Sequence, residues 1–467
     1  MFKVSDTSSA MAKLHSRVHI IDDLLGGTER MREASKTYLP KFPLEDNDAY
    51  KNRLERTTLY PALEETLSQM NGRVFFNPIN VAKINNKITT EILPDVDMEG
   101  NNLDVFASSW FHAGLAYGVS YVLVDYPVTN DAKTLAEEKA MGARPYLVHI
   151  HPSLVLGFKT DRINGKRVFT QFRYREFIDE EFGEFGLRQV EQINVYERGR
   201  VRKFRKIENA KDGENDYYLH AEVELKHLGK TLDFIPIVPF ITKQANHFGI
   251  GRPPLLELAH LNIKHWQSQS DQDNIVSVAR VPILARTGVV EGTEFQIGGS
   301  IVELPRESNL FYVEHSGNAI GAGKESIKEL ESQMLVAGAK LLVKNVIAMT
   351  ESQARDEQGK EISLLRLYAN KFEDALDLAL EYIGFWLGID NVGNVEISGN
   401  IDNEVDPNAS LDMIIKLNAA GVISTQTTFE EAKRRGLLSD NTDWENEQAR
   451  LDSIGISGGF YEQENER

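Results

Sequence analysis

The segment from Gly251 to Gly388 constrains the fold more than any other, because it alternates long helical stretches with one short β-rich stretch. Gly251-Arg252-Pro253-Pro254 opens the segment, and proline is tolerated in a helix only within the first turn. The first helix is therefore predicted over Leu255–Ala279, with Pro282 ending it.

A second helix is predicted from Lys324 to about Val343, and a third from Thr350 to about Leu387. The second carries an apolar stripe with residues every three or four positions: Ile327, Leu330, Met334, Ala337 and Leu341. In the third, Thr350 and Gln353 form a capping box, and Gly388 ends the helix. Three β-rich stretches cut by glycines lie between the first two helices: Val281–Ala285, Glu294–Leu304 and Asn309–Val313. The order predicts two antiparallel helices with a small β module at one end, then a loop at Lys344–Met349 and a long helix.

This order resembles the stem, clip, tunnel loop and spine helix of portal proteins from tailed double-stranded-DNA bacteriophages. Five stretches carry the resemblance: 251–262, His265-Trp266-Gln267-Ser268 with Ser270-Asp271, 279–284, 312–317 and 319–326. No single one of them is diagnostic, whereas the ordered set is. The resemblance covers most of the chain.

The resemblance implies an α+β portal fold with seven parts. These are a wing or body at 1–250, stem helix 1 at 251–280, a clip at 281–322, stem helix 2 at 323–343, a tunnel loop at 344–350, a spine helix at 351–388, and a crown and tail at 389–467. It also implies a dodecameric ring at one capsid vertex of the virion, assembled in the host cytoplasm. Its implied partners are other copies of itself, double-stranded viral DNA bound without sequence specificity, a terminase, a head–tail adaptor and the major capsid protein.

The resemblance also places candidate contact residues. The expected DNA-channel residues cluster around the loop after the second helix: Lys340, Lys344, Arg355 and Lys360. The expected adaptor contacts lie in the clip: Ile283, Leu284, Phe295, Ile301 and Phe311. For Lys344, DNA proximity and an ordinary solvated lysine are both open interpretations.

The first 250 residues predict an α+β body. Helices are expected at Thr7–Leu25, Asn47–Thr57 and Tyr60–Met70, and in the stretch with Phe106 and Trp110 that stops at Gly118. A buried strand is expected at 120–126, and an antiparallel meander is expected to begin at Tyr146–Ile150. Asn164-Gly165 is a strong signal for a type I′ hairpin turn. Further strands are predicted at 188–196, 200–206, 217–224 and 236–241.

The charge distribution argues against a protein that grips nucleic acid through a basic surface. The formal net charge is −18. Residues 389–467 hold 16 acidic and 6 basic residues, net −10, whereas residues 158–206 hold 13 basic and 8 acidic, net +5. Helices are predicted in the acidic region at Pro407–Ala419, Ser424–Arg435 and Asp443–Ile454.

The basic stretch has two interpretations. Arg198, Arg200 and Arg202 alternate along a predicted strand, so they could contact nucleic acid or a partner. The favoured alternative is a solvated face paired with acids such as Glu180, Glu181 and Glu184, or with a neighbouring subunit.

No pattern for catalysis, a metal or a cofactor emerges. Gly323-Lys324 is followed by Glu325 and position 318 is Asn, so the 317–326 stretch is not a phosphate loop but a turn into the second helix. His149 with His151, and the acidic pairs Asp22-Asp23 and Asp271 with Asp273, lack companion ligands and favour structural roles. No apolar run is long enough to span a membrane and no signal-peptide pattern opens the chain. Cysteine is absent, which excludes disulfides.

We therefore expect a non-enzymatic portal protein without cofactors. One alternative is a smaller head–tail adaptor or other structural ring protein; length and element order favour the portal. A nucleic-acid-processing enzyme is the rival from another class, but it needs clustered ligands or a base–nucleophile pair.

Overall fold

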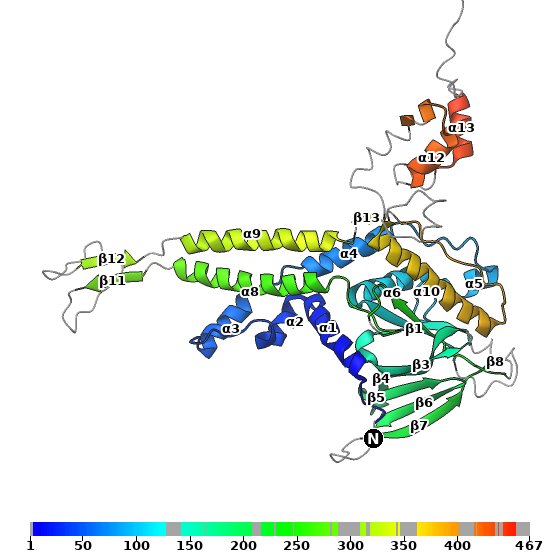
Figure 1. Ribbon diagram of the computed structural model, residues 1–467, viewed down its shortest axis with the longest axis horizontal. Coiled ribbons are helices and arrows are strands. Elements are labelled where there is room, and N and C mark those ends of the chain that lie inside the picture. The colour runs from blue at the N-terminus through cyan, green and yellow to red at the C-terminus, as the bar shows by residue number, and fades with distance from the viewer. Residues whose placement is uncertain are drawn as a thin grey trace, which may run out of the picture.

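The computed structural model describes residues 3–127, 142–163, 165–207, 216–227, 230–245, 247–280, 283–287, 309–313, 318–341, 344–345, 362–399, 401, 415–416, 418–434, 438 and 442–453. An α+β body carries a long helix pair, α8 and α9, which projects from it (Figure 1). A small hairpin lies at the far end of that pair (Figure 1). The prediction of an α+β chain is confirmed at this level.

The described elements before the first strand are all helical. Their bounds are α1 Ser9–Leu25, α2 Gly27–Ala34, the 3-10 turn η1 Ser35–Thr37, α3 Asn47–Arg56, α4 Ala62–Val74, α5 Asn86–Glu91 and α6 Leu103–Tyr117. Ser8 caps α1 by accepting a hydrogen bond from the Met11 amide, and Asp46 caps α3 in the same way through Ala49. Gly118 ends α6 at φ 83°, in the left-handed region.

A three-stranded antiparallel sheet lies at the centre of the body. Its strands run in the order β10 (Ile237–Ile241), β1 (Val119–Asp125) and β2 (Tyr146–Ile150). The middle strand β1 is buried along nearly its whole length, which explains its apolar run Tyr121, Val122, Leu123 and Val124. β2 belongs to this sheet, so the prediction that the meander begins with it is wrong.

The meander is a second, five-stranded antiparallel sheet in sequence order. It consists of β3 Val155–Ile163, β4 Lys166–Phe182, β5 Gly186–Glu197, β6 Arg200–Lys206 and β7 Tyr217–Glu224. Ile163 faces Lys166 across the predicted turn, where Gly165 has φ +81°. The hairpin prediction is therefore confirmed. A short 3-10 turn, η2 Pro152–Leu154, precedes β3, and the two-residue strands β8 Lys226–His227 and β9 Lys230–Thr231 come after β7.

Helix α10, Leu364–Leu387, completes the core. Its Phe372 meets Trp110, Phe111 and Phe240 with ring centroids 4.8–5.3 Å apart, which joins α10 to α6 and β10. Gly388 ends the helix at φ 67°, as predicted. The predicted start at Thr350 differs from the structure, because Ile362–Ser363 is the strand β14 and the Ser363 hydroxyl caps the helix. Residues 346–361 lie outside the described part.

The segment after α10 belongs to the body rather than to a crown. Val392, Val395, Ile397 and Ile401 are buried in the main core. The Glu373 and Asp377 carboxylates of α10 accept hydrogen bonds from the Ile397 and Val395 amides at 2.6 and 2.8 Å. Glu396 also pairs with Asn80 in an isolated bridge. The expected boundary at 389 is therefore too early by about a dozen residues. The later helices, α12 Thr425–Arg434 and α13 Trp444–Ser453, pack on each other through Phe429 and Trp444.

Candidate stem, clip and channel residues

The projecting pair consists of α8, Leu256–Ala279, and α9, Asn318–Ala339. At 1.5 Å per residue these helices are about 36 and 33 Å long. Ile327, Leu330 and Met334 are buried, which confirms the predicted apolar stripe. However, α9 begins six residues before the predicted Lys324 and ends four before Val343, so residues 318–326 are helix rather than a turn.

Polar side chains connect α8 to the segments around α3 and α4. The Asn262 amide is buried, donates to the Tyr60 carbonyl at 2.9 Å and accepts from the Leu63 amide. Further along, the Ser270 hydroxyl lies 2.8 Å from the Thr57 hydroxyl, and both residues are buried. Since a buried polar group is costly without a partner, these pairs fix the rotation of α8 about its axis. The stem is therefore anchored along its body half.

Contacts between α8 and α9 set the register of the stem. The Gln272 amide donates to the Ile320 carbonyl at 3.0 Å, and His265 Nε2 lies 3.4 Å from a Glu331 carboxylate oxygen. A Cβ placed on Gly323 would lie 2.1 Å from Oε1 of Gln272. Gly323 therefore lies within α9, beside the Gln272 side chain of α8, and not in a phosphate-binding turn.

The outer face of α9 is polar over most of its length. Lys324 and Lys328 are exposed, as is Lys340 just beyond the helix. Near the body end, however, Leu335 and Val336 keep 77% and 63% of their surface exposed.

Two strands form the described part of the predicted clip at the far end of the stem (Figure 1). β11, Ile283–Thr287, pairs antiparallel with β12, Asn309–Val313. Ile283 lies opposite Val313, Leu284 opposite Tyr312, and Phe311 opposite Ala285. The two outer β predictions are thus confirmed, apart from a two-residue shift in the first. Phe295 and Ile301 lie outside the described residues.

The four predicted channel lysines and arginines do not all fall in the described part. Lys340 is exposed at the body end of α9. Lys344 lies in the two-residue strand β13, Lys344–Asn345, and pairs with Ser363 of β14 immediately before α10. The expectation that Lys344 begins a free loop is therefore wrong. Arg355 and Lys360 lie outside the described residues, between these two strands.

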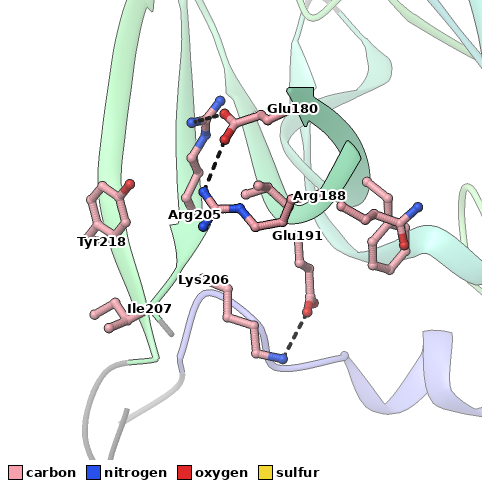
Figure 2. Close-up of a pocket in the computed structure, with 10 residues that line it drawn as sticks. Glu180, Arg188, Glu191, Arg205, Lys206, Ile207 and Tyr218 are labelled. Atoms are coloured by element: carbon pink, nitrogen blue, oxygen red, sulfur yellow. Dashed lines mark hydrogen bonds and ion pairs between the residues drawn. The ribbon is translucent and has the colours of Figure 1, made fainter. Parts of the chain in front are cut away.

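The basic stretch of the second sheet is paired with acids. Arg200 contacts Glu197 and Glu222, and Arg202 contacts Glu197 at 3.1 Å. Arg205 contacts Glu180 at 2.7 Å, and Lys206 contacts Glu191 at 3.1 Å, as Figure 2 shows. Arg198 lies in the turn between β5 and β6, not on a strand. The favoured interpretation, a face paired with acids, is confirmed for Glu180. No ion pair among the described residues involves Glu181 or Glu184.

The candidate ligand histidines have structural partners. The Ser120 hydroxyl lies 2.6 Å from Nε2 of His149, and burial lowers the pKa of this imidazole to about 4. His151 lies just after β2, caps η2, and faces Asp22 at 3.6 Å. Asp23 accepts from Arg30 and from the Tyr38 hydroxyl, both at 2.7 Å, while Asp271 faces Arg53 and Asp273 accepts from Gln269. Within the described ranges, no group of three such ligands could hold a metal.

One exposed apolar surface was not predicted from the sequence. The β4–β5 turn exposes Phe182, Phe185 and Leu187, each with more than 60% of its surface accessible. The signal was present in Phe182-Gly183-Glu184-Phe185, where apolar residues flank a turn instead of a strand face.

Comparisons with known proteins give two kinds of match. A family described as "Domain of unknown function (DUF4055)" matches residues 254–387, from α8 to the end of α10. No curated protein matches the chain. Among solved structures, a chain from the neck of an empty gene transfer agent particle is 12% identical, with a TM-score of 0.40 over 81% of this chain and 90% of that one. A chain from the virion of a native gene transfer agent particle is 11% identical, with a TM-score of 0.41 over 87% and 98%. Among the described helices, none is long and apolar enough to cross a membrane.

Proposed function

We propose that this chain is a portal-type ring protein through which double-stranded viral DNA passes during packaging and ejection. The observation that carries the proposal is the projecting stem. Two antiparallel helices leave the body, a β hairpin lies at their far end, and the chain returns to the body beside α10 (Figure 1). A compact monomer has no need to project helices of this length. The same order of elements underlies the portal resemblance of the sequence.

The spacing of packed helices agrees with a channel for duplex DNA built from about twelve copies. Packed helices lie about 8–10 Å apart, so an inner layer around a duplex roughly 20 Å across takes about ten or more helices. With one lining helix per subunit, twelve copies are enough and six are too few. Under this proposal α9 is the lining candidate, because its outer face is exposed and mostly polar while its other face packs on α8.

The charge suits a conduit better than a clamp. Twelve copies at −18 each sum to −216. A basic channel would release counterions from DNA, bind it tightly and hold it in place. Overall repulsion with a few basic points, such as Lys340 at the body end of the stem, lets DNA slide.

The proposal assigns partners to the two ends of the stem. We infer that the hairpin of β11 and β12 binds a head–tail adaptor, since an edge strand can pair with another chain and, among the described residues, each of these strands pairs only with the other. A separate terminase would supply the ATP-driven motor, and the wing would face the major capsid protein. The chain itself is proposed to have no catalytic activity, and its place is proposed to be the portal vertex of the virion.

Negative-stain imaging and native mass measurement of the purified chain test the proposal. We expect a ring with a central hole and a mass near twelve times 52.7 kDa. A small adaptor ring is the second candidate, and a lumen too narrow for duplex DNA would favour it. A chain that stays monomeric at high concentration and moderate salt would overturn both.

A further inference from the structure

The outer half of the β4–β5 hairpin extends beyond the rest of its sheet. β3 pairs with β4 only as far as Tyr174, and β6 pairs with β5 only as far as Gln192. From there β4 and β5 continue as a two-stranded ribbon up to the pair Phe182 and Gly186. We call residues 175–191 the arm. The outer part of the ribbon, residues 181–189, is exposed throughout, so its surface is open to a partner.

The arm is both apolar and acidic. Phe185 is 93% exposed, Leu187 71% and Phe182 66%. Over residues 175–191 there are two basic residues, Arg175 and Arg188, against six acidic ones: Glu176, Asp179, Glu180, Glu181, Glu184 and Glu191. Of these acids, Glu180 pairs with Arg188 and Arg205, and Glu191 pairs with Arg175 and Lys206. Asp179, Glu181 and Glu184 are exposed and form no ion pair in the part that the structure describes.

A recess lies where the arm meets the ends of β6 and β7. Its volume is about 740 Å³. Phe177 and Val190 line it from the arm, and Ile207 and Tyr218 from the other side, beside the ion pairs drawn in Figure 2. The recess gives the arm a concave base that can seat a protruding turn.

The opposite end of the same sheet has the complementary chemistry. The β3–β4 turn and the strand ends that flank it, residues 159–167, carry Lys159, Arg162, Lys166 and Arg167, all exposed, against the single acid Asp161. β4 joins both turns and has 17 residues, so they lie roughly 54 Å apart at about 3.4 Å per residue. The acidic arm of a chain therefore cannot reach the basic turn of the same chain.

We propose that the arm of one subunit docks on the β3–β4 turn of the next subunit in the ring. Two different, complementary surfaces at opposite ends of one sheet make a head-to-tail contact, which closes into a ring when the rotation permits. Opposite charges steer the two surfaces together, and the aromatic tip supplies the apolar area. This inference rests on the proposed ring and names a contact that builds it.

Cysteine cross-linking tests the contact directly, because the chain has no cysteine of its own. The double variant Glu184→Cys with Lys166→Cys should give, on mild oxidation, a ladder of covalent multimers that a thiol reductant collapses. Each single variant should give no ladder. The matched control joins Glu184→Cys to Lys51→Cys on α3, an exposed position away from the sheet, and should also give none.

Charge reversal provides a second, independent readout. Arg162→Glu with Lys166→Glu should raise the concentration for half-dissociation of the ring about tenfold. Adding Glu181→Lys and Glu184→Lys to the same chain should bring the half-dissociation concentration back to within about threefold of the wild-type value. If wild-type chains form rings but the cysteine variant gives no ladder and the charge variants have no effect, the arm contact is wrong and the proposed ring remains. A wild-type chain that never forms rings would overturn both.

Discussion

The Arg53 guanidinium of α3 donates to the Glu45 carboxylate at 2.8 and 2.9 Å, and both side chains are more than 90% buried. The same guanidinium lies 3.6 Å from Asp271 on α8 and 4.2 Å from the Phe42 ring. This cluster ties α3 to α8. Its strength comes from geometry, since a buried charge is stable only when it is paired.

Arg53→Met should destabilise the chain strongly, by about 3–5 kcal/mol, because it leaves the Glu45 carboxylate buried without a counter-charge. Urea unfolding followed by circular dichroism measures the change. The double variant Arg53→Met with Glu45→Leu should recover much of the loss. Lys51→Ala on the exposed face of α3 is the control, with an effect within about 0.5 kcal/mol. Equal losses for the single and double variants would contradict this account.

Two truncations test where the folded body ends. Ending the chain after Ile401 should leave a folded body, because Val392, Val395, Ile397 and Ile401 stay in the core. Ending it after Gly388 should cost on the order of 5 kcal/mol, since four buried aliphatic side chains are lost. Thermal unfolding of the two proteins compares them. Equal stability would place the 389–401 segment outside the core.

Acid should weaken the fold through buried histidines. His149 stays neutral in the folded chain down to about pH 4, whereas the unfolded chain takes up this proton below about pH 6.5. The contribution of the neutral His149 to folding stability is therefore complete above pH 6.5 and is lost as the pH falls toward 4. Burial also lowers the pKa of His15 and of His151, in the same direction.

The measurement is the unfolding free energy at pH 7, 5.5 and 4.5. The unfolding free energy of His149→Gln should decrease less steeply with falling pH than that of wild type. His260→Gln, at an exposed position of α8, should keep the wild-type slope. If His149→Gln loses stability just as steeply as wild type, the assignment to His149 is wrong.

Replacing the hairpin tests the proposed adaptor site. A short glycine–serine linker in place of Ile283–Val313 should leave the body folded, because the ends of α8 and α9 already lie together and the stem packs through residues nearer the body. Adaptor binding, measured by co-sedimentation with assembled rings, should be lost. Unchanged binding would move the adaptor site elsewhere.

Lys344→Glu tests proximity to DNA. Lys344 lies in β13, beside the start of α10, so one such charge per subunit would ring the channel at the body end of the stem. Exposed charge contacts are individually weak and screened by salt, so rings of normal size are expected, with altered packaged genome length or DNA leakage. Lys51→Glu, at an exposed position of α3 outside the proposed channel, is the control and should leave packaging and DNA retention as in wild type. Particles that package and retain DNA as wild type does would make Lys344 an ordinary solvated lysine.

Elements with local signals could be predicted from residue patterns. The α9 stripe from Ile327 to Met334, the stop at Gly388 and the turn at Gly165 all depend on spacing and backbone preference within a few residues. The stem, its hairpin and the helix after them could therefore be placed in order from residue patterns alone.

Features that depend on partners distant in the chain could be seen only in the folded structure. Helix α10 begins at Leu364 and not at Thr350, because Ile362–Ser363 pairs with β13. The 389–401 segment lies in the core, because carboxylates of α10 accept hydrogen bonds from its backbone amides. No window of sequence contains both halves of such a contact. The arm depends on distant partners in the same way. β4 and β5 continue beyond the last residues that pair with β3 and β6, and it is strand pairing, not strand propensity, that sets where a sheet ends.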